Sequence, residues 1–216
     1  ILPSGNVLKT ILEVAKEIGK STRVITTTEV THATPAAFYS HVNDRDSYSE
    51  IARQLVEEAD VDVIMGGGKN RFSNSQLSTM EARGYEIIET RTQLQEISSD
   101  KVLGLFTSGA LPYERNRNRN ITPSIAEMTR KGIEILSTDM DEFFLMVEGG
   151  QIDWAAHANN QENVVLETIE FDRAVAETIQ YVNSHNNTIL IVTADHETGG
   201  LSVISHNFKT ELPSAN

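Results

Sequence analysis

Hydrophobic residues recur at helical spacing near the start of the chain and then gather into short continuous runs. Apolar positions between Val7 and Ile18 follow a helical period, and Gly19 is placed to end that helix. A strand is predicted over residues 23–28, and the Thr34-Pro35 step predicts a short helical start. A second helix from about residue 47 then leads to a compact apolar run, residues 61–65, that is typical of a buried strand.

The same alternation continues along the rest of the chain. The further predicted strands are residues 85–89, 101–106, 143–147 and 189–193, and the further predicted helices are residues 76–83, 92–97, 122–136 and 163–184. Strands that are continuous apolar runs, separated by helices, are typical of a parallel sheet that is buried on both faces. The predicted fold class is therefore α/β, with a mostly parallel sheet sandwiched between helices.

The length and the first residue bear on domain organisation. The 216 residues are enough for one α/β domain with a sizeable core, so we expect a single domain over 1–216. The chain begins with Ile1 rather than Met, and an amphipathic helix is predicted almost at once. We interpret the sequence as part of a longer chain.

Composition excludes several classes of protein and site. The balance of 18 Lys and Arg against 31 Asp and Glu gives a net charge of −13, which disfavours a nucleic-acid-binding surface. No apolar run is long enough to span a bilayer, and this segment shows no positively charged start followed by a hydrophobic signal region. Because the chain has no cysteine, any metal ion must be bound by His, carboxylate, hydroxyl or water.

Metal-binding types of residue follow three of the predicted strands. His32 and Thr34 come after the first strand, Glu148 ends the strand over 143–147, and the Asp195-His196 pair follows the strand over 189–193. Ligands of open α/β sheets bind outside the carboxyl ends of the strands. We therefore expect these side chains to converge at one edge of the sheet.

A spacing of four residues places Asp153 and His157 on one face of a helical turn, at the separation of two ligands of one metal ion. Glu148 lies just upstream, and the two glycines that follow it allow a sharp turn. A carboxylate on one metal ion can thus lie beside a second ion bound by the next turn. The pattern predicts a two-metal site.

Each of these residues also has a purely structural interpretation. His157 alone is more often a surface residue, Asp153 and Asp195 could cap helices, Thr34 could only begin one, and Glu148 could be a solvated strand end. Trp154 could be ordinary packing or a wall of the site. The grouping of hard and borderline ligands at three strand ends favours the metal site.

Other polar features point to no chemistry. His41, His185 and His206 have no ligand-rich neighbourhood and are interpreted as structural or exposed. The Gly-Gly-Gly-Lys run at 66–69 lacks the full phosphate-loop spacing and predicts a turn. Arg115, Arg117 and Arg119 are expected to lie in a solvated loop.

Three long motifs give the chain its resemblance to a known family. They are Thr-His-Ala-Thr-Pro-Ala-Ala at 31–37, Val-Glu-Gly-Gly-Gln-Ile-Asp-Trp-Ala-Ala-His at 147–157 and Thr-Ala-Asp-His-Glu-Thr-Gly-Gly at 193–200. In type and order they resemble the alkaline phosphatase family, and the likeness extends from about residue 10 to residue 200. The resemblance implies hydrolysis of phosphate monoesters through a phosphoserine intermediate, with two zinc ions and one magnesium ion.

The resemblance also implies a role for each site residue. Asp153 and His157 are similar to ligands of the first zinc, Asp195 and His196 to ligands of the second, and Thr34 and Glu148 to ligands of the magnesium. Arg45 is similar to the arginine that grips the phosphate of the substrate and of the inorganic phosphate product. The resemblance further implies a homodimer that is periplasmic or secreted.

The chain departs from the family pattern at several points. Many members carry Asp where His32 stands and some carry Lys where Trp154 stands, whereas marine, cold-active bacterial members are similar in pairing His with Trp. The difference implies a weaker or differently occupied magnesium site. The Asp-Ser-Ala motif with the nucleophilic serine, an aspartate shared between metals and a further zinc-binding histidine are absent, so we expect this segment alone to be inactive.

Two other classes of function stay open on the sequence. One is a phosphodiesterase, sulfatase or phosphomutase of the same superfamily, which differs in the ester that it processes. The other is a non-catalytic module that binds metal or phosphate and has lost its nucleophile. An Asp-Ser-Ala motif upstream in the parent gene would favour the phosphatase over the module.

Overall fold

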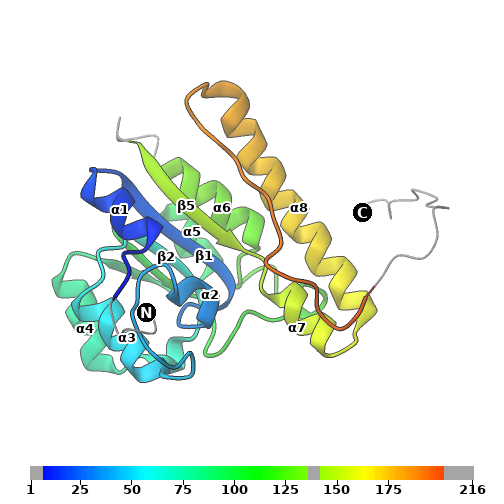
Figure 1. Ribbon diagram of the computed structural model, residues 1–216, viewed down its shortest axis with the longest axis horizontal. Helices are drawn as coiled ribbons and strands as arrows, with labels where there is room; N and C mark the ends of the chain where they lie inside the picture. The colour runs from blue at the N-terminus through cyan, green and yellow to red at the C-terminus, as the bar shows by residue number, and fades with distance from the viewer. Residues whose placement is uncertain (1–6, 136–141, 202–216) are drawn as a thin grey trace.

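A parallel sheet lies at the centre of the molecule (Figure 1). The structure is a computed structural model that describes residues 7–135 and 142–201. The strands are β1 (Ser21–Glu29), β2 (Val63–Gly67), β3 (Glu86–Ile88), β4 (Val102–Leu105) and β5 (Phe143–Glu148). Within the described residues they lie in the order β3-β4-β2-β1-β5, and every neighbouring pair is parallel. The predicted fold class is confirmed.

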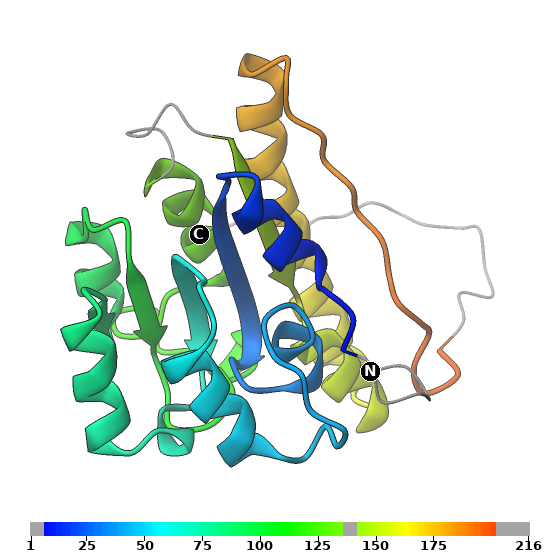
Figure 2. The same ribbon diagram turned by 60° about the vertical axis from the view of Figure 1, so that its left-hand side comes forward.

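Helices cover both faces of this sheet (Figures 1 and 2). They are α1 (Ile11–Glu17), α2 (Ala33–Ala36), α3 (Tyr48–Glu57), α4 (Asn74–Ala82), α5 (Arg91–Glu96), α6 (Ile125–Glu134), α7 (Gln151–His157) and α8 (Gln161–Ser184), with short 3₁₀ turns η1 (Lys69–Arg71) and η2 (Glu114–Asn116). One apolar cluster joins α1, α3 and α4 to one face, and a second joins α5, α6 and α8 to the other.

The two clusters explain why neighbouring residues within the strands are apolar. Val24 and Ile64 belong to the first cluster, while their neighbours Ile25 and Met65 belong to the second. All four side chains are fully buried. Since successive residues of a strand point to opposite faces, a strand covered on both sides favours apolar residues at neighbouring positions.

Capping residues shift the helix starts from the predicted positions. Thr10 Oγ1 accepts a hydrogen bond from the Glu13 N–H at 3.1 Å, and the Glu13 carboxylate accepts one from the Thr10 N–H at 2.7 Å. This reciprocal pair fixes the start of α1 at Ile11, so the expectation of a helix from Val7 is wrong. The helix predicted over 122–136 corresponds to α6, which ends at Glu134. Its predicted end at residue 136 lies outside the described residues.

The run Ile189–Thr193 is not a strand, contrary to the prediction. It is extended but pairs with no strand of the sheet, and Ile189 and Ile191 are 87% and 80% exposed. A hollow of about 740 Å³, lined largely by apolar residues, separates residues 187–192 from β5 and α8. β-Branched residues favour a strand only where a neighbouring strand can pair with them. Among the described residues, no helix is long and apolar enough to cross a membrane.

Ser124 caps α6, the helix that packs against α8 and β1. Its Oγ accepts a hydrogen bond from the Glu127 N–H at 3.2 Å, and the Glu127 carboxylate accepts one from the Ser124 N–H at 2.9 Å. We expect Ser124→Ala to lower the free energy of unfolding by about 1 kcal/mol, measured by denaturant titration. The exposed Ser78→Ala in α4 serves as the control, and an equal effect of both would contradict the capping role.

Candidate metal and phosphate site

Glu148 ends β5 at the carboxyl edge of the sheet, where Thr26 of β1 is its partner in register. The Thr26 hydroxyl donates to Glu148 Oε2 at 2.6 Å, and the Thr28 hydroxyl lies 3.4 Å from the same oxygen. Glu148 is half-buried, and these hydroxyls hold its carboxylate in one orientation. The strand pairing therefore places an acidic side chain at the carboxyl edge of the sheet.

The turn from β5 into α7 depends on Gly150. A Cβ atom at this position would lie 2.5 Å from Thr28 Cγ2 and 3.0 Å from Glu148 Cδ. The next residue, Gln151, donates its backbone N–H to Thr27 Oγ1 at 3.0 Å and begins the helix. The glycine lets the backbone approach β1 closely, so α7 starts directly beside the Glu148 carboxylate.

Asp153 and His157 lie on the same side of α7, as their spacing predicts. The distance from His157 Nε2 to Asp153 Oδ1 is 3.5 Å. The His157 side chain is 70% exposed and the Asp153 side chain is 34% exposed. Both groups are therefore accessible from solvent and close enough to bind one ion. Whether they bind metal stays a prediction.

Thr198 links α7 to the segment with Asp195 and His196. Its hydroxyl donates to Asp153 Oδ1 at 2.6 Å and lies 3.2 Å from His196 Nδ1. The chain also approaches α7 closely at Gly199, where a Cβ atom would lie 2.5 Å from the Ala156 carbonyl oxygen. The structure thus brings the third motif next to the second even though its predicted strand is absent. Sequence reasoning missed Thr198, because its partner is 45 residues away.

The pKa of His196 is raised, mainly because its ring is hydrogen-bonded to the Glu197 carbonyl and also because the carboxylates of Asp195 and Asp153 are near. His196 Nδ1 lies 2.9 Å from that carbonyl oxygen, and Nε2 lies 3.3 Å from Asp195 Oδ2. The imidazole is surrounded by negative charge and is exposed. These are surroundings in which a cation is stabilised.

His32 and Trp154 pack against one another, as the edge of one ring meets the face of the other. Their centroids are 5.5 Å apart, with an angle of 75° between the planes. His32 precedes α2, so this contact joins the end of β1 to α7. Trp154 therefore packs beside Asp153 and against His32, and its role as a wall of the site stays a prediction.

Burial lowers the pKa of His32, and the positive charge of Arg45 lowers it further, while Glu148 and Asp153 act in the opposite direction. The imidazole is therefore neutral near pH 7, the form that can bind a metal ion. Its Nδ1 is buried and has no hydrogen-bond partner among the described residues. Four groups from distant parts of the chain are thus within electrostatic reach of one another.

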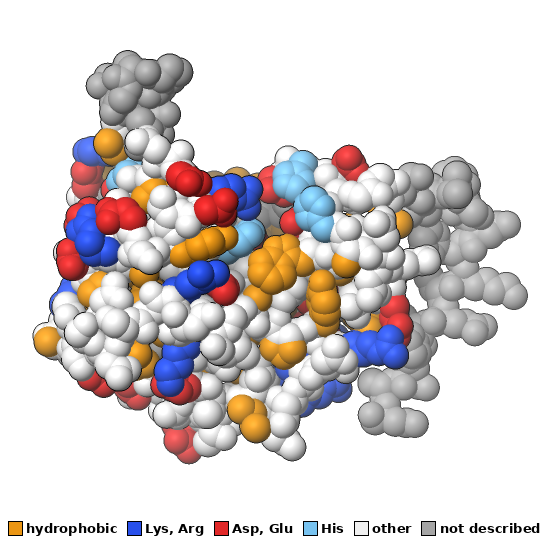
Figure 3. Space-filling view, turned by 90° about the horizontal axis from the view of Figure 1, so that it is seen from below, with side chains coloured by type: hydrophobic (Ala, Val, Ile, Leu, Met, Phe, Trp, Pro, Cys, Tyr) orange, Lys and Arg blue, Asp and Glu red, His pale blue; other side chains and the backbone are white. Residues whose placement is uncertain are grey.

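Arg45 lies in the loop between α2 and α3 and is exposed. Among the described residues it forms no hydrogen bond or ion pair, so its guanidinium is free to bind an anion. Thr34 lies two residues after His32, within α2, and is half-exposed. Figure 3 shows histidine side chains together with acidic and basic ones around a hollow on the lower face of the molecule.

The chemistry of these residues fits the predicted ions, but the ligand sets are incomplete. Histidine and carboxylate are typical zinc ligands, and carboxylate and hydroxyl are typical magnesium ligands. Within residues 7–135 and 142–201, no three His, Asp or Glu side chains come close enough to hold a metal ion. The two-metal site stays a prediction that needs further ligands.

Comparison with known proteins gives the family of this chain. The family model for alkaline phosphatase matches residues 2–215. The chain belongs to the alkaline phosphatase family. Alkaline phosphatase 3 of Bacillus subtilis (strain 168) is 39% identical over 207 residues, which cover 92% of this chain and 45% of that protein. The human tissue-nonspecific isozyme of alkaline phosphatase is 37% identical over 237 residues, with 89% and 45% covered.

Solved alkaline phosphatases share the fold described above. A cold-active alkaline phosphatase from the psychrophile Shewanella sp. superposes with a TM-score of 0.89 at 40% identity, covering 94% of this chain and 50% of that one. The alkaline phosphatase of the Antarctic bacterium TAB5 gives a TM-score of 0.85 at 35% identity, covering 93% and 59%. The chain spans about half the length of the relatives that it matches.

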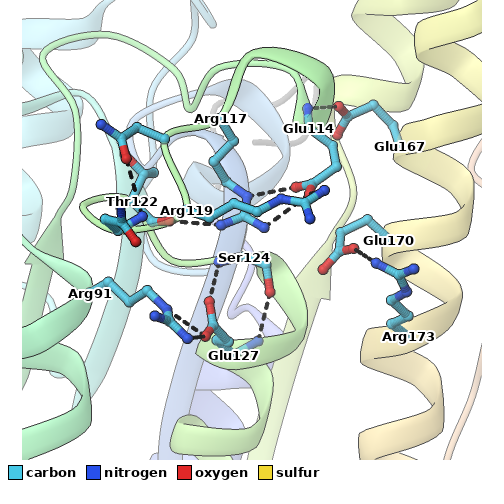
Figure 4. Close-up of polar contacts among 12 residues, drawn as sticks. Arg91, Glu114, Arg117, Arg119, Thr122, Ser124, Glu127, Glu167, Glu170 and Arg173 are labelled. Carbon is cyan, nitrogen blue, oxygen red and sulfur yellow. Dashed lines mark hydrogen bonds and ion pairs between the residues drawn. The ribbon is translucent and has the colours of Figure 1, made fainter. Parts of the chain in front are cut away.

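A buried polar cluster lies between η2 and α8 (Figure 4). Arg117 donates to both carboxylate oxygens of Glu114, at 2.6 and 2.9 Å, and both side chains are less than 10% exposed. The Glu114 N–H in turn donates to Glu167 Oε1 at 2.5 Å. The expectation of a solvated arginine loop is therefore wrong for Arg117, because its ion-pair partner is buried.

The remaining predictions on histidines and glycines have mixed outcomes. His41 is structural, as predicted, with Nε2 2.8 Å from Glu13 Oε1, and His185 is exposed and stacks on Tyr181. His206 lies outside the described residues. In the run at 66–69, Gly66 and Gly67 end β2, and the predicted turn is confirmed only from Gly68, which has φ +95° and precedes η1.

The protonation of the Glu167 carboxyl group changes near neutral pH. Burial raises its pKa to about 7, and the carboxylates of Glu114 and Glu170 add to the rise, while the Glu114 N–H and Arg117 oppose it. Since the pKa is higher in the folded state, the unfolded state binds fewer protons. The free energy of unfolding therefore falls as the pH rises from about 4.5 to about 7.

We expect Glu167→Gln, whose side chain stays neutral, to remove this fall in the free energy of unfolding between about pH 4.5 and about pH 7. Above pH 7 the variant should be more stable than the original chain, by up to about 3 kcal/mol. Denaturant titrations at pH 5, 6, 7 and 8 measure the difference. The exposed Glu162→Gln on the same helix is the control, and a parallel pH profile for Glu167→Gln and the original chain would contradict the prediction.

Proposed function

We propose that the complete protein hydrolyses phosphate monoesters with the help of metal ions, and that these residues supply part of its metal and phosphate site. The observation that carries the proposal is that the charges of Glu148, Asp153 and Arg45 all act on the His32 imidazole after β1, in a member of the alkaline phosphatase family. Carboxylates that could bind cations and a guanidinium that could bind phosphate thus lie within electrostatic range of one imidazole.

The residues present suggest which groups would hold which ion. Asp153 and His157 would bind one zinc, Asp195 and His196 a second, and Thr34 with Glu148 the magnesium. When bound, these ions supply positive charge that activates a hydroxyl and stabilises the departing oxygen. A solved TAB5 alkaline phosphatase variant is described with Mg bound in its M3 site, which supports a magnesium ion here.

The chain's own side chains have distinct tasks in this proposal. Arg45 binds the phosphate through its planar, two-pronged set of N–H donors. Thr26 and Thr198 fix the orientations of Glu148 and Asp153 by hydrogen bonds of 2.6 Å each. Trp154 and His32 close one side of the site by their ring contact. We assign the phosphoserine intermediate to a serine elsewhere in the complete protein, so this segment alone should bind but not turn over substrate.

The experiment compares ester classes on the complete protein supplied with zinc and magnesium. We expect a phosphate monoester such as p-nitrophenyl phosphate to be hydrolysed much faster than the corresponding phosphodiester or sulfate ester. A preference for the diester or the sulfate would replace the phosphatase by another member of the superfamily. Phosphate binding without any turnover would favour a binding module. The homodimer and the exported location stay predictions of the family resemblance.

A further inference from the structure

The loop that carries Arg45 is held by its neighbours rather than by Arg45 itself. The Asp46 N–H donates to Asp44 Oδ1 at 3.0 Å, and the Ser47 N–H donates to the Asp44 carbonyl at 3.1 Å. The Tyr48 hydroxyl donates to Asp46 Oδ1 at 3.1 Å. Tyr48, the first residue of α3, is therefore attached to the residue next to Arg45.

Arg71, which ends η1, connects Tyr48 to the sheet. Its guanidinium carbon lies 4.0 Å from the centre of the Tyr48 ring, the geometry of a cation–π contact. On its other side, Arg71 Nε donates to Glu29 Oε2 at 2.7 Å. One planar guanidinium thus contacts a tyrosine and a carboxylate that come from different elements.

Glu29 provides a fixed end for this set of contacts. It ends β1, pairs in register with Gly67 of β2, and its side chain is only 11% exposed. Its Cβ lies so near Gly68 that a Cβ added there would be 2.9 Å away. A carboxylate this buried requires a charged partner, and Arg71 is that partner.

We propose that Arg71 is a positioning residue for phosphate binding. It holds Tyr48 against the edge of the sheet, and through Tyr48 and Asp46 it holds the loop that carries Arg45. The inference rests on the proposed function, because it assigns Arg45 to the phosphate. An exposed arginine on a loop loses conformational freedom when it binds an anion, and that loss weakens binding. A loop that is already held in place loses less, so the contacts from Glu29 to Tyr48 raise the affinity for phosphate without touching it.

The test is a double-mutant cycle on the complete protein loaded with zinc and magnesium, with inorganic phosphate as the probe in calorimetric titrations. We expect Arg71→Ala to weaken phosphate binding roughly two- to tenfold. In the Arg45→Ala background the same change should have no further effect, since Arg71 acts only through Arg45. The control is Arg53→Ala, a partly exposed arginine of α3 that pairs with Glu50 and Glu57 of its own helix.

Additive losses in the cycle, or an unchanged affinity in Arg71→Ala, would overturn the proposal. Tyr48→Phe provides a milder second variant, because it keeps the ring over which Arg71 lies and removes only the hydroxyl bound to Asp46. It should fold like the original chain and lose part of the affinity, whereas full affinity would reject the link through Asp46. Metal content, measured in parallel, should not change in any variant of the cycle.

The test of Arg71 and the test of the proposed function can fail independently of one another. If the complete protein binds phosphate and shows the coupling but hydrolyses no monoester, the enzymatic proposal fails and the positioning role of Arg71 stands. If it hydrolyses monoesters and Arg71→Ala binds phosphate as tightly as the original protein, the positioning role alone fails.

Discussion

Replacing Asp153 with alanine in the complete protein will lower its zinc content and its turnover of phosphate monoesters together, the turnover by about 100-fold or more. The carboxylate lies 3.5 Å from His157 Nε2 and accepts the Thr198 hydroxyl at 2.6 Å, so it connects the second motif with the third. Its removal leaves His157 without its neighbour and frees the segment that carries His196.

Metal analysis and steady-state kinetics on the same preparation check this prediction. Asp172→Ala is the matched control, because Asp172 is an exposed aspartate on α8 away from the site, and it should change neither quantity. Unchanged metal stoichiometry in Asp153→Ala would reject Asp153 as a ligand. A loss of metal with full turnover would reject the metal dependence of the reaction.

Arg45→Ala will raise the inhibition constant of inorganic phosphate roughly 10- to 100-fold and leave the bound metal in place. Hydrogen bonds between charged groups contribute about 1.5–3 kcal/mol, and a guanidinium can donate two of them to one phosphate. Arg45 forms no ion pair among the described residues, so its removal leaves no buried partner unsatisfied and should not affect folding.

Competitive inhibition by phosphate, followed at several substrate concentrations, measures this effect. Arg45→Lys keeps the charge but not the planar pair of donors, and it should lie between the alanine variant and the original protein. If phosphate inhibited Arg45→Ala as strongly as the original protein, Arg45 would have no role in binding it.

The fold could be predicted from the sequence because burial on both faces of the sheet leaves a local signature. Val24 and Ile25 point to opposite faces and are both apolar, and the same holds for Ile64 and Met65. Helix starts could not be placed so well, since the position of the first turn of α1 depends on one reciprocal pair, Thr10 with Glu13. A window of hydrophobicity does not detect such a pair.

The candidate site could be predicted in part, because some of its features are also local in the sequence. The four-residue spacing of Asp153 and His157 is a local feature, and the structure places the two side chains together. The contacts of Arg71 with Glu29 and of Thr198 with Asp153 span 42 and 45 residues, so no local pattern indicates them. Such pairs depend on which strands become neighbours in the sheet.

Ile189–Thr193 shows the opposite case, in which a strong local preference is not realised. The residues are β-branched or apolar, yet they pair with no strand in the described part of the chain and leave Ile189 and Ile191 exposed. A strand is stabilised by its hydrogen-bonded neighbours more than by its own propensity, and here a hollow separates the run from β5.

The pairing of β1 with β5 has a consequence for the order in which the molecule is made. Thr26 and the Glu148 carboxylate that it binds are 122 residues apart, and β5 is the last strand along the described part of the chain. A ribosome must therefore synthesise all the intervening elements before this edge of the sheet can close. Closing so long a loop costs chain entropy, so we expect the acidic group beside α7 to reach its final orientation after contacts between elements nearer in sequence have formed.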